Sequence, residues 1–181
     1  MDLGLKNKVA VVCGSSRGLG KATAQCLAQE GISVILCSSN PANLEKAKQD
    51  TQKVSSGEVT AIAANLSDHE DISRLIEALF KKCDHLDILV NNTGWPTPGK
   101  FEELSIDNWQ QAYEDMFISA VMLIKSVLPG MKSQRWGRIL NITSIAVKQP
   151  VENLILSNSI RADITGLART LANEVTPFGI R

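Results

Sequence analysis

Ser157 and Arg161 lie four residues apart in NLILSNSIRADITGLARTLANEV (153–175), a stretch that repeats apolar residues at helical spacing. The hydroxyl and the guanidinium therefore lie one turn apart on one face of the expected helix. A hydroxyl beside a fixed positive charge can hold a substrate oxygen and stabilise negative charge that develops on it. The spacing alone leaves three interpretations: a reaction centre, the remains of one, or the solvated end of a buried helix.

A glycine-rich segment follows the first apolar run of the chain. Gly14, Gly18 and Gly20 lie in CGSSRGLGKATAQCLAQEG, which leads directly into a helical pattern. Glycine allows backbone N–H groups to approach a phosphate closely, and the amino end of a helix attracts negative charge. Strand, glycines and helix in this order predict a dinucleotide phosphate site, although G-x-x-x-G-x-G differs from the G-x-G-x-x-G form. A tight turn without a ligand is the alternative.

The same segment contains G-x-S-x-G, from Gly14 to Gly18, which is also the pattern of a hydrolase nucleophile turn. That serine needs a histidine base. His69 and His85 are the two histidines, both in polar, helical surroundings and neither near the end of the chain, where hydrolases of that fold place theirs. We therefore favour dinucleotide binding over hydrolysis.

The end of the second apolar run bears on the type of dinucleotide. A NAD site usually has a carboxylate there to bind the ribose 2′-hydroxyl, whereas this run continues into Ser38, Ser39 and Asn40. Arg17 adds a positive charge nearby. These residues predict NADP in preference to NAD. The alternative is that Arg17 only occupies a solvated helix start.

Composition and charge argue against several classes of protein. The 181 residues are 44% hydrophobic, enough for one domain with a full core, and 19 basic residues balance 19 acidic ones. A neutral chain offers no basic field to nucleic acid or to an anionic membrane, so neither is an expected partner. We see no apolar stretch of membrane-spanning length and no secretory signal, and we expect a cytoplasmic protein. Four widely spaced cysteines predict buried reduced thiols and no metal site.

Short apolar runs alternate with helical patterns along the chain. Each run is apolar throughout, as in strands that helices cover on both faces. This order predicts an α/β fold with a doubly wound parallel sheet and Rossmann-type dinucleotide-binding topology. The runs are KVAVVC ending at Cys13, ISVILC ending at Cys37, EVTAIA ending at Ala63, LDILV ending at Val90 and GRILNIT ending at Thr143.

Two of the expected helices have capping signals. Asn40 followed by Pro41 predicts an N-cap with proline in the first turn. Ser67 with Glu70 three residues later predicts a capping box ahead of apolar residues at helical spacing. These signals place the helix starts close to the ends of the second and third strands.

Two longer helices are expected over about 107–132 and over 153–175, the second of them stopped by Thr176-Pro177. Residues 178–181 then resemble a turn into another strand. We therefore expect residues 1–181 to form a single dinucleotide-binding domain that is truncated at the start of its sixth strand, without the later strands and the substrate loop.

Several ordered motifs resemble the short-chain dehydrogenase/reductase family, and most closely its members similar to 3-oxoacyl-acyl-carrier-protein reductase. Besides the glycine segment, they are NLSD after the third run, VNNTG after the fourth and GRILNITS at the fifth. The resemblance covers the whole chain. It implies a dinucleotide-dependent oxidoreductase that acts on a small carbonyl or alcohol substrate.

The resemblance also implies which residues bind the dinucleotide. Asn65 stands where the family usually has aspartate, and Thr93 replaces alanine in the N-N-A-G turn. An amide at position 65 can still hydrogen-bond the adenine edge. The implied binding residues, with the two serines after the second run, are Gly14, Ser16, Arg17, Gly18, Leu19, Gly20, Ser38, Ser39, Asn65, Leu66, Asn92, Thr93, Gly94 and Arg161.

The catalytic positions implied by the resemblance are mostly changed. Ser144 matches the family's serine, whereas Ser157 stands in place of the tyrosine, Arg161 in place of the lysine and Met116 in place of the asparagine that holds a relay water. A serine hydroxyl is a far weaker acid than a phenol, and arginine does not share its proton. We expect Ser144 and Ser157 to orient the substrate oxygen while Arg161 binds ribose and stabilises charge.

Two hypotheses follow from the changed positions. The first is an NADP-dependent oxidoreductase with an altered centre, in which water or a ribose hydroxyl supplies the proton. The second is a catalytically silent nucleotide-binding sensor or assembly protein. Self-association into a homodimer or homotetramer through the two long helices is also expected, because 153–175 has more apolar surface than one sheet face needs. Tyr113 is expected to pack or to join that interface, and the alternative is that it faces the same cleft as Met116 one turn later. Trp95 is expected to line a substrate pocket or to cover the sheet end.

Overall fold

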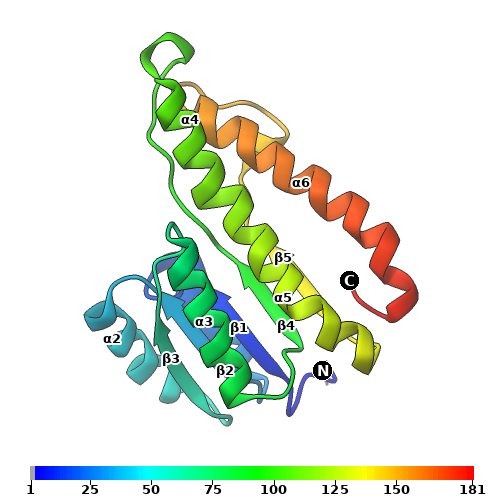
Figure 1. Cartoon of the computed structure of the whole chain (residues 1–181). Coiled ribbons are helices and arrows are strands. Elements are labelled where there is room, and N and C mark those ends of the chain that lie inside the picture. The colour runs from blue at the N-terminus through cyan, green and yellow to red at the C-terminus, as the bar shows by residue number, and fades with distance from the viewer. Residues whose placement is uncertain (1–2) are drawn as a thin grey trace.

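The computed structural model describes residues 3–181, and its centre is a parallel sheet of five strands in the order β3-β2-β1-β4-β5 (Figure 1). The predicted doubly wound parallel sheet is confirmed. The strands are β1 (Val9–Cys13), β2 (Ser33–Ser38), β3 (Val59–Ala63), β4 (Ile88–Asn91) and β5 (Arg138–Asn141).

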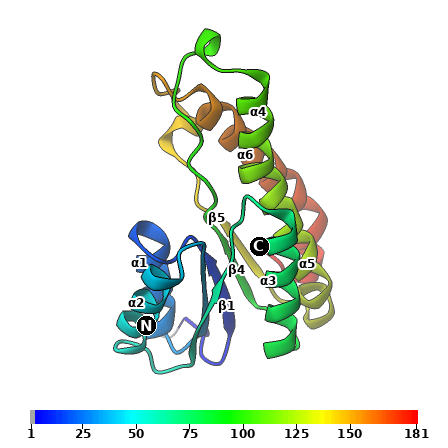
Figure 2. The same cartoon turned by 60° about the vertical axis from the view of Figure 1, so that its left-hand side comes forward.

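Helices cover both faces of this sheet, which is why its central strands are apolar throughout. Figure 2 shows α1 (Gly18–Gln29) and α2 (Pro41–Gln52) on one face, and α3 (His69–Lys82), α5 (Ser119–Gln134) and α6 (Ile155–Val175) on the other. Successive residues of a strand point to opposite faces. In β1, Val12 accordingly packs in the core with α1 and α2, and Val11 packs in the core with α3 and α5.

The predicted start of α2 is confirmed, whereas that of α3 was one residue too early. Asn40 accepts a hydrogen bond from the N–H of Asn43 through its side-chain oxygen, at 2.9 Å. The N-cap of α3 is Asp68, whose carboxylate accepts from the two following backbone N–H groups. The expected capping box of Ser67 and Glu70 does not form, because the N–H of Ser67 bonds instead to the side chain of Asn65 at 3.2 Å.

The helix expected over 107–132 is continuous but not regular. It comprises α4 (Ile106–Tyr113), a π-helical turn (Glu114–Ile118) and α5. Met116 lies in the π-helical turn, is 0% exposed, and packs with Leu156 and Ile160 of α6. The wider turn thus coincides with the contact between these long helices.

The stretch Ile106–Gln134 is long and apolar enough to cross a membrane, judged by length and composition only. The expectation concerned uninterrupted apolar stretches, and this helix is interrupted by Asp107, Glu114, Asp115 and Lys125. Core helices of globular proteins pass the same test, and one row of α5 side chains is buried against the sheet.

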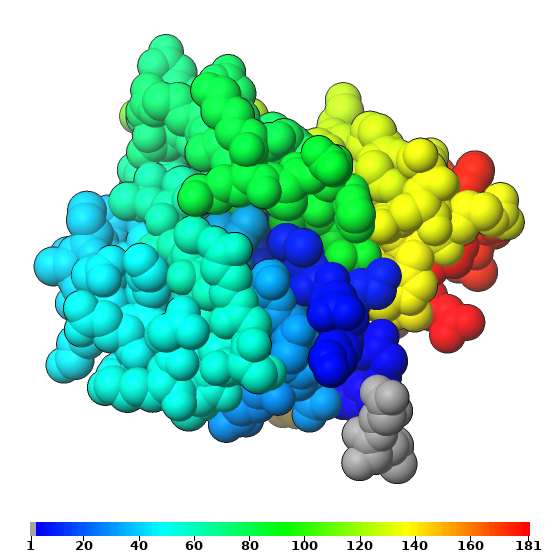
Figure 3. All heavy atoms as spheres, turned by 90° about the horizontal axis from the view of Figure 1, so that it is seen from below, coloured from blue at the N-terminus to red at the C-terminus, as the bar shows by residue number. Residues whose placement is uncertain are grey.

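The last residues of the chain form one isolated parallel bridge, between Ile180 and Gly137 just before β5, and the expected sixth strand stays a prediction. After α6 a single 3₁₀ turn, Thr176–Phe178, leads to Gly179. The N–H of Arg181 donates to the carbonyl of Gly137 at 3.0 Å, and the carbonyl of Arg181 accepts from Ile139 at 2.9 Å. Figure 3 shows these C-terminal residues (red) beside the segment that precedes and includes β5 (yellow).

Two of the remaining expectations need correction. Cys13 and Cys37 are buried as expected, but Cys26 is exposed, because it lies on the outer side of α1, and Cys83 is only partly buried. His85 lies in the loop between α3 and β4 and not in a helix.

Candidate functional site

A cleft of about 810 Å³ opens at the carboxyl ends of the strands, where ligands bind in open parallel sheets. Segments that follow all five strands reach it, together with one residue of α6. Its lining is Gly14, Ser16, Arg17, Gly18, Leu19, Ser38, Ser39, Asn40, Asn43, Ala64, Asn65, Leu66, Ser67, Asn92, Thr93, Gly94, Trp95, Asp115, Ile142, Thr143 and Arg161.

Gly14 and Gly20 are required by close packing between the first turn of α1 and the turn after β4, whereas Gly18 has open space around it and a φ of 56°. Gly14 has a φ of 59°, and a Cβ added to it would lie 2.7 Å from the side-chain nitrogen of Asn92. A Cβ on Gly20 would overlap the carbonyl oxygen of Gly14. Asn92 itself donates to that carbonyl at 3.4 Å. The glycine segment is therefore held in one conformation around the amino end of α1, and Gly20 supports it from beneath without lining the cleft.

Ser15 connects the glycine segment to β2, a role that the sequence analysis missed. Its hydroxyl donates to the carbonyl of Cys37 at 3.2 Å and accepts from the N–H of Cys37 at 2.9 Å. The side chains of Ser38 and Ser16 consequently lie side by side, and Ser38 donates to Ser16 at 2.9 Å. The doublet Ser15-Ser16 was visible in the sequence, but nothing there distinguished the buried serine from the partly buried one.

One end of the cleft is polar and has no carboxylate. Arg17 is the N-cap residue of α1, and it forms no ion pair with any residue of 3–181. Ser38, Ser39, Asn40 and Asn43 lie on the same cleft wall. An anionic group bound at this end would meet hydroxyls, amides and a guanidinium.

Asn65 and Leu66 form the rim beyond β3. The N–H of Asn65 donates to a carboxylate oxygen of Asp71 at 3.0 Å, so the loop is fixed onto the first turn of α3. This hydrogen bond and the guanidinium of Arg74 lower the pKa of Asp71 below its usual value. Asp71 therefore stays ionised and keeps the loop in place at neutral pH.

The turn after β4 is fixed by the π-helical turn. The hydroxyl of Thr93 donates to the carbonyl of Met116 at 3.3 Å. Gly94 has a φ of 30°, and a Cβ there would lie 3.1 Å from the Cγ of Met116. Thr93, which replaces the alanine of N-N-A-G, therefore contacts Met116, which replaces the family's asparagine.

Arg161 connects three segments at the opposite end of the cleft. Its Nε donates to the hydroxyl of Ser157 at 3.1 Å, and its two terminal nitrogens donate to the carbonyls of Ile142 at 3.0 Å and Gly94 at 3.3 Å. Arg161 is only 7% exposed, and burial lowers the pKa of its guanidinium. It therefore holds together the loops that follow β4 and β5.

Ser157 and Ser144 do not line the cleft. Ser157 is 6% exposed, and its hydroxyl faces Arg161 along α6. The hydroxyl of Ser144 accepts from the N–H of Ala146 at 3.2 Å and caps the short turn Ile145–Val147. Of the three predicted catalytic residues, only Arg161 reaches the cleft surface.

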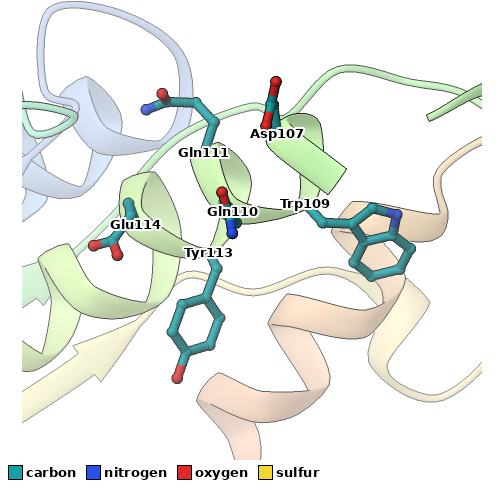
Figure 4. A pocket seen from close by; sticks show the side chains of 6 residues that line it. All are labelled: Asp107, Trp109, Gln110, Gln111, Tyr113 and Glu114. Atoms are coloured by element: carbon teal, nitrogen blue, oxygen red, sulfur yellow. The ribbon is translucent and has the colours of Figure 1, made fainter. Parts of the chain in front are cut away.

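The two aromatic residues noted in the sequence differ in position. Trp95 lines the cleft and is 77% exposed. Tyr113 does not line it and stacks on Phe117, with ring centroids 5.0 Å apart. It belongs to a shallow hollow on the outer side of α4, and Figure 4 shows that the side chains there spread in different directions without enclosing a site.

The sequence analysis missed Asp115 and Thr143 in the lining. Asp115 precedes Met116, and its carboxylate accepts from the side chain of Gln111 at 2.7 Å. No histidine, lysine, tyrosine or cysteine is among the lining residues. The described part of the chain therefore puts none of the usual general acids with a nitrogen, phenol or thiol proton on the cleft surface except arginine, which does not give up its proton.

Comparisons with known proteins agree with this geometry. The family model for short chain dehydrogenase matches residues 8–181. A 3-oxoacyl-[acyl-carrier-protein] reductase of Synechocystis is 30% identical over 97% of this chain and 71% of its own length. The structure of L-sorbose reductase from Gluconobacter frateurii, complexed with NADPH and L-sorbose, is 31% identical with a TM-score of 0.95 and covers 100% of this chain and 69% of its own. An NAD⁺-bound xylitol dehydrogenase is 25% identical with a TM-score of 0.90, over 98% and 68%.

Proposed function

The chain belongs to the short-chain dehydrogenase family, and from this premise we propose that it is an NADP(H)-dependent oxidoreductase with an altered catalytic centre, acting on a carbonyl or alcohol group. The observation that carries the proposal is the glycine segment, where a side chain at Gly14 or Gly20 would collide with its neighbours. The nicotinamide supplies the hydride for carbonyl reduction, or accepts it in the reverse direction. The protein binds and orients the two reactants.

The cleft lining supports NADP as the cofactor. Arg17, Ser38 and Ser39 provide a cation and two hydroxyls for a 2′-phosphate, and no carboxylate at that end opposes it. The backbone N–H groups of the glycine segment take the pyrophosphate at the amino end of α1. The rim at Asn65 and Leu66 receives the adenine, and the turn at 92–94 supports the ribose.

The protein groups at the other end of the cleft polarise the substrate. Arg161 places a fixed positive charge at this end of the cleft, where an oxygen of the substrate gains negative charge. Ser157 fixes the guanidinium through its hydroxyl. Ser144 caps the turn Ile145–Val147 and so fixes the loop after β5 that carries the lining residue Thr143. Protonation would then come from water or a ribose hydroxyl, because no histidine, lysine, tyrosine or cysteine is among the residues that line the cleft.

A second candidate function is dinucleotide binding without turnover, as a sensor or an assembly protein. Two observations favour it. The hydroxyl of Ser157 is directed at Arg161 and not into the cleft, and the Met116 side chain is fully buried where the family has an amide. In this case the dinucleotide stabilises the protein and its conformation carries the signal.

A fluorescence titration with NADPH, followed by turnover assays on a panel of ketones and aldehydes, distinguishes the two functions. Binding with turnover supports the oxidoreductase, and binding without turnover supports the silent protein. Absence of NADPH binding would reject both.

The preference for NADPH is tested by comparing the dissociation constants of NADPH and NADH. We expect NADPH to bind at least about tenfold more tightly, and Arg17→Ala to remove most of this difference, because one charged hydrogen bond contributes roughly that much. Lys125→Ala, which removes an exposed cation from α5, is the control and should leave the ratio unchanged. Equal affinities of the wild-type protein for the two dinucleotides would reject the preference.

A further inference from the structure

The guanidinium of Arg161 is a buried charge without a counter-ion in the described chain. The ion pairs among residues 3–181 involve the cations Lys8, Lys21, Lys53, His69, Arg74 and His85, and none includes Arg161. Its three hydrogen bonds go to neutral oxygens. Burial of a charge without an opposite charge is costly unless a bound group compensates it.

Arg161 also has donors to spare. A guanidinium has five N–H groups in a fixed plane, and three are used, so two remain. Because Arg161 lines the cleft, a ligand there can reach the free N–H groups. One nearby carboxylate, that of Asp115, lies beyond ion-pair distance and bonds to Gln111 instead.

The missing negative charge is not expected from the dinucleotide phosphates. Those belong at the glycine segment after β1, whereas Arg161 is bonded to the loops after β4 and β5. The neighbours of Arg161 in the lining suit a small organic molecule. They are the exposed ring of Trp95 and the side chains of Ile142 and Thr143, and no hydrogen bond of the Thr143 hydroxyl is found within residues 3–181.

We propose that the Arg161 end of the cleft binds a carboxylate carried by the substrate, so that the substrate is an oxo acid or the corresponding hydroxy acid. The two free N–H groups of the guanidinium hold the carboxylate, and Thr143 donates to the carbonyl or hydroxyl oxygen. That the bound carboxylate belongs to a substrate rests on the proposed oxidoreductase function. The carboxylate site itself does not require turnover.

The test compares acetoacetate with acetoacetamide, two oxo compounds of nearly equal shape that differ in charge. Their binding is measured by calorimetry, with and without saturating NADP⁺. We expect acetoacetate to bind at least about tenfold more tightly, because a carboxylate pairs with a guanidinium through two charged hydrogen bonds. Equal binding of the two probes by the wild-type protein would overturn the proposal without any variant.

Variants at two arginines of α6 assign the preference to one residue. Arg161→Gln should abolish it, and Arg161→Lys should keep part of it, because lysine retains the charge but not the planar pair of donors. Arg169→Gln is the matched control, since it removes the same charge from an exposed position on the same helix. A preference that survives Arg161→Gln, or that is lost in Arg169→Gln, would contradict the proposal.

A parallel NADPH titration separates this inference from the proposed function. Carboxylate preference without NADPH binding would support the anion site and reject the oxidoreductase. NADPH binding that weakens in Arg161→Gln, with no carboxylate preference in the wild type, would mean that the guanidinium serves the dinucleotide, and the inference would be wrong.

Discussion

At Gly20 a single methyl group decides whether the glycine segment keeps its shape. Its Cβ would overlap the carbonyl oxygen of Gly14, so Gly20→Ala must displace the turn between β1 and α1. We expect a loss of about 1–3 kcal/mol in the free energy of unfolding and at least about tenfold weaker NADPH binding. Urea denaturation and fluorescence titration measure these two effects.

Gly130 supplies the control for this substitution. It lies inside α5, and a Cβ there would be 3.5 Å from the Cβ of His85, an ordinary contact distance. Gly130→Ala should therefore stabilise the protein by up to about 1 kcal/mol, as alanine does inside helices. If both variants behaved alike, the tight packing at Gly20 would have no energetic importance.

The spacing of residues in the sequence predicted which side chains share a helical face, but not all of the hydrogen bonds that they form. Ser157 and Arg161 were expected on one helical face, and their hydrogen bond confirms this. The direction of the Ser157 hydroxyl depends on the carbonyls that hold Arg161, which come from loops distant in sequence. For the same reason, the sequence did not reveal that Ser15 is bonded to Cys37.

Between the helices α1 and α2, Asp50 forms ion pairs with Lys21 at 2.8 Å and Lys53 at 2.9 Å. These lysines lower the pKa of Asp50 from its usual 3.8 to about 2. A carboxyl with a lowered folded pKa stabilises the protein above its unfolded pKa, and this stabilisation is lost as the pH falls through the folded value.

Asp50→Asn should therefore lower the melting temperature at about pH 7, and the difference from wild type should vanish as the pH approaches about 2. The effect is small because the Asp50 side chain is only partly buried, so water screens its ion pairs. Glu45→Gln on the same helix, where Glu45 forms no ion pair with residues 3–181, is the control, and thermal melts across the acid range measure both. An undiminished Asp50→Asn difference at the lowest pH would contradict this assignment.

The strands could be predicted at the level of elements because their sequences are apolar on both faces. The π-helical turn could not, since it depends on how Met116 packs against Leu156 and Ile160 of α6. Local propensity also does not decide between Ser67 and Asp68 as the N-cap, because both residues are good caps. Contacts with Asn65 select Asp68.

In the whole molecule, the apolar surface expected for self-association is smaller than the sequence implied. Of the apolar row on α6, Ile160, Ile164 and Val175 are buried within the chain itself. The outer face of α6 instead has small and polar residues, among them the exposed Ala162 and Gly166. Small residues allow two helices to approach closely, so a second copy of the chain remains the expected partner of this face.

Gly166→Arg tests this assembly. A Cβ at Gly166 meets nothing within 4 Å, so the larger side chain should leave the fold of one chain intact. We expect light scattering to show a dimer or tetramer for the wild type at micromolar concentration and a monomer for the variant. Asn173→Arg, an exposed change near the end of α6, should matter less. A monomeric wild type would contradict self-association.

The adjacent strands β1 and β2 place Cys13 directly beside Cys37, and both thiols are fully buried in the middle of the sheet. The contact with Cys13 and burial raise the pKa of the Cys37 thiol well above its usual value, and burial keeps reagents away from both sulfurs while the sheet is closed. Once Cys26 and Cys83 are replaced by serine, labelling with a disulfide reagent should therefore report the rate at which the sheet opens. NADPH should slow that labelling, and the more so the more tightly it binds. The labelling rate of this thiol pair therefore measures how much of the protein has the cofactor bound, without any enzymatic turnover.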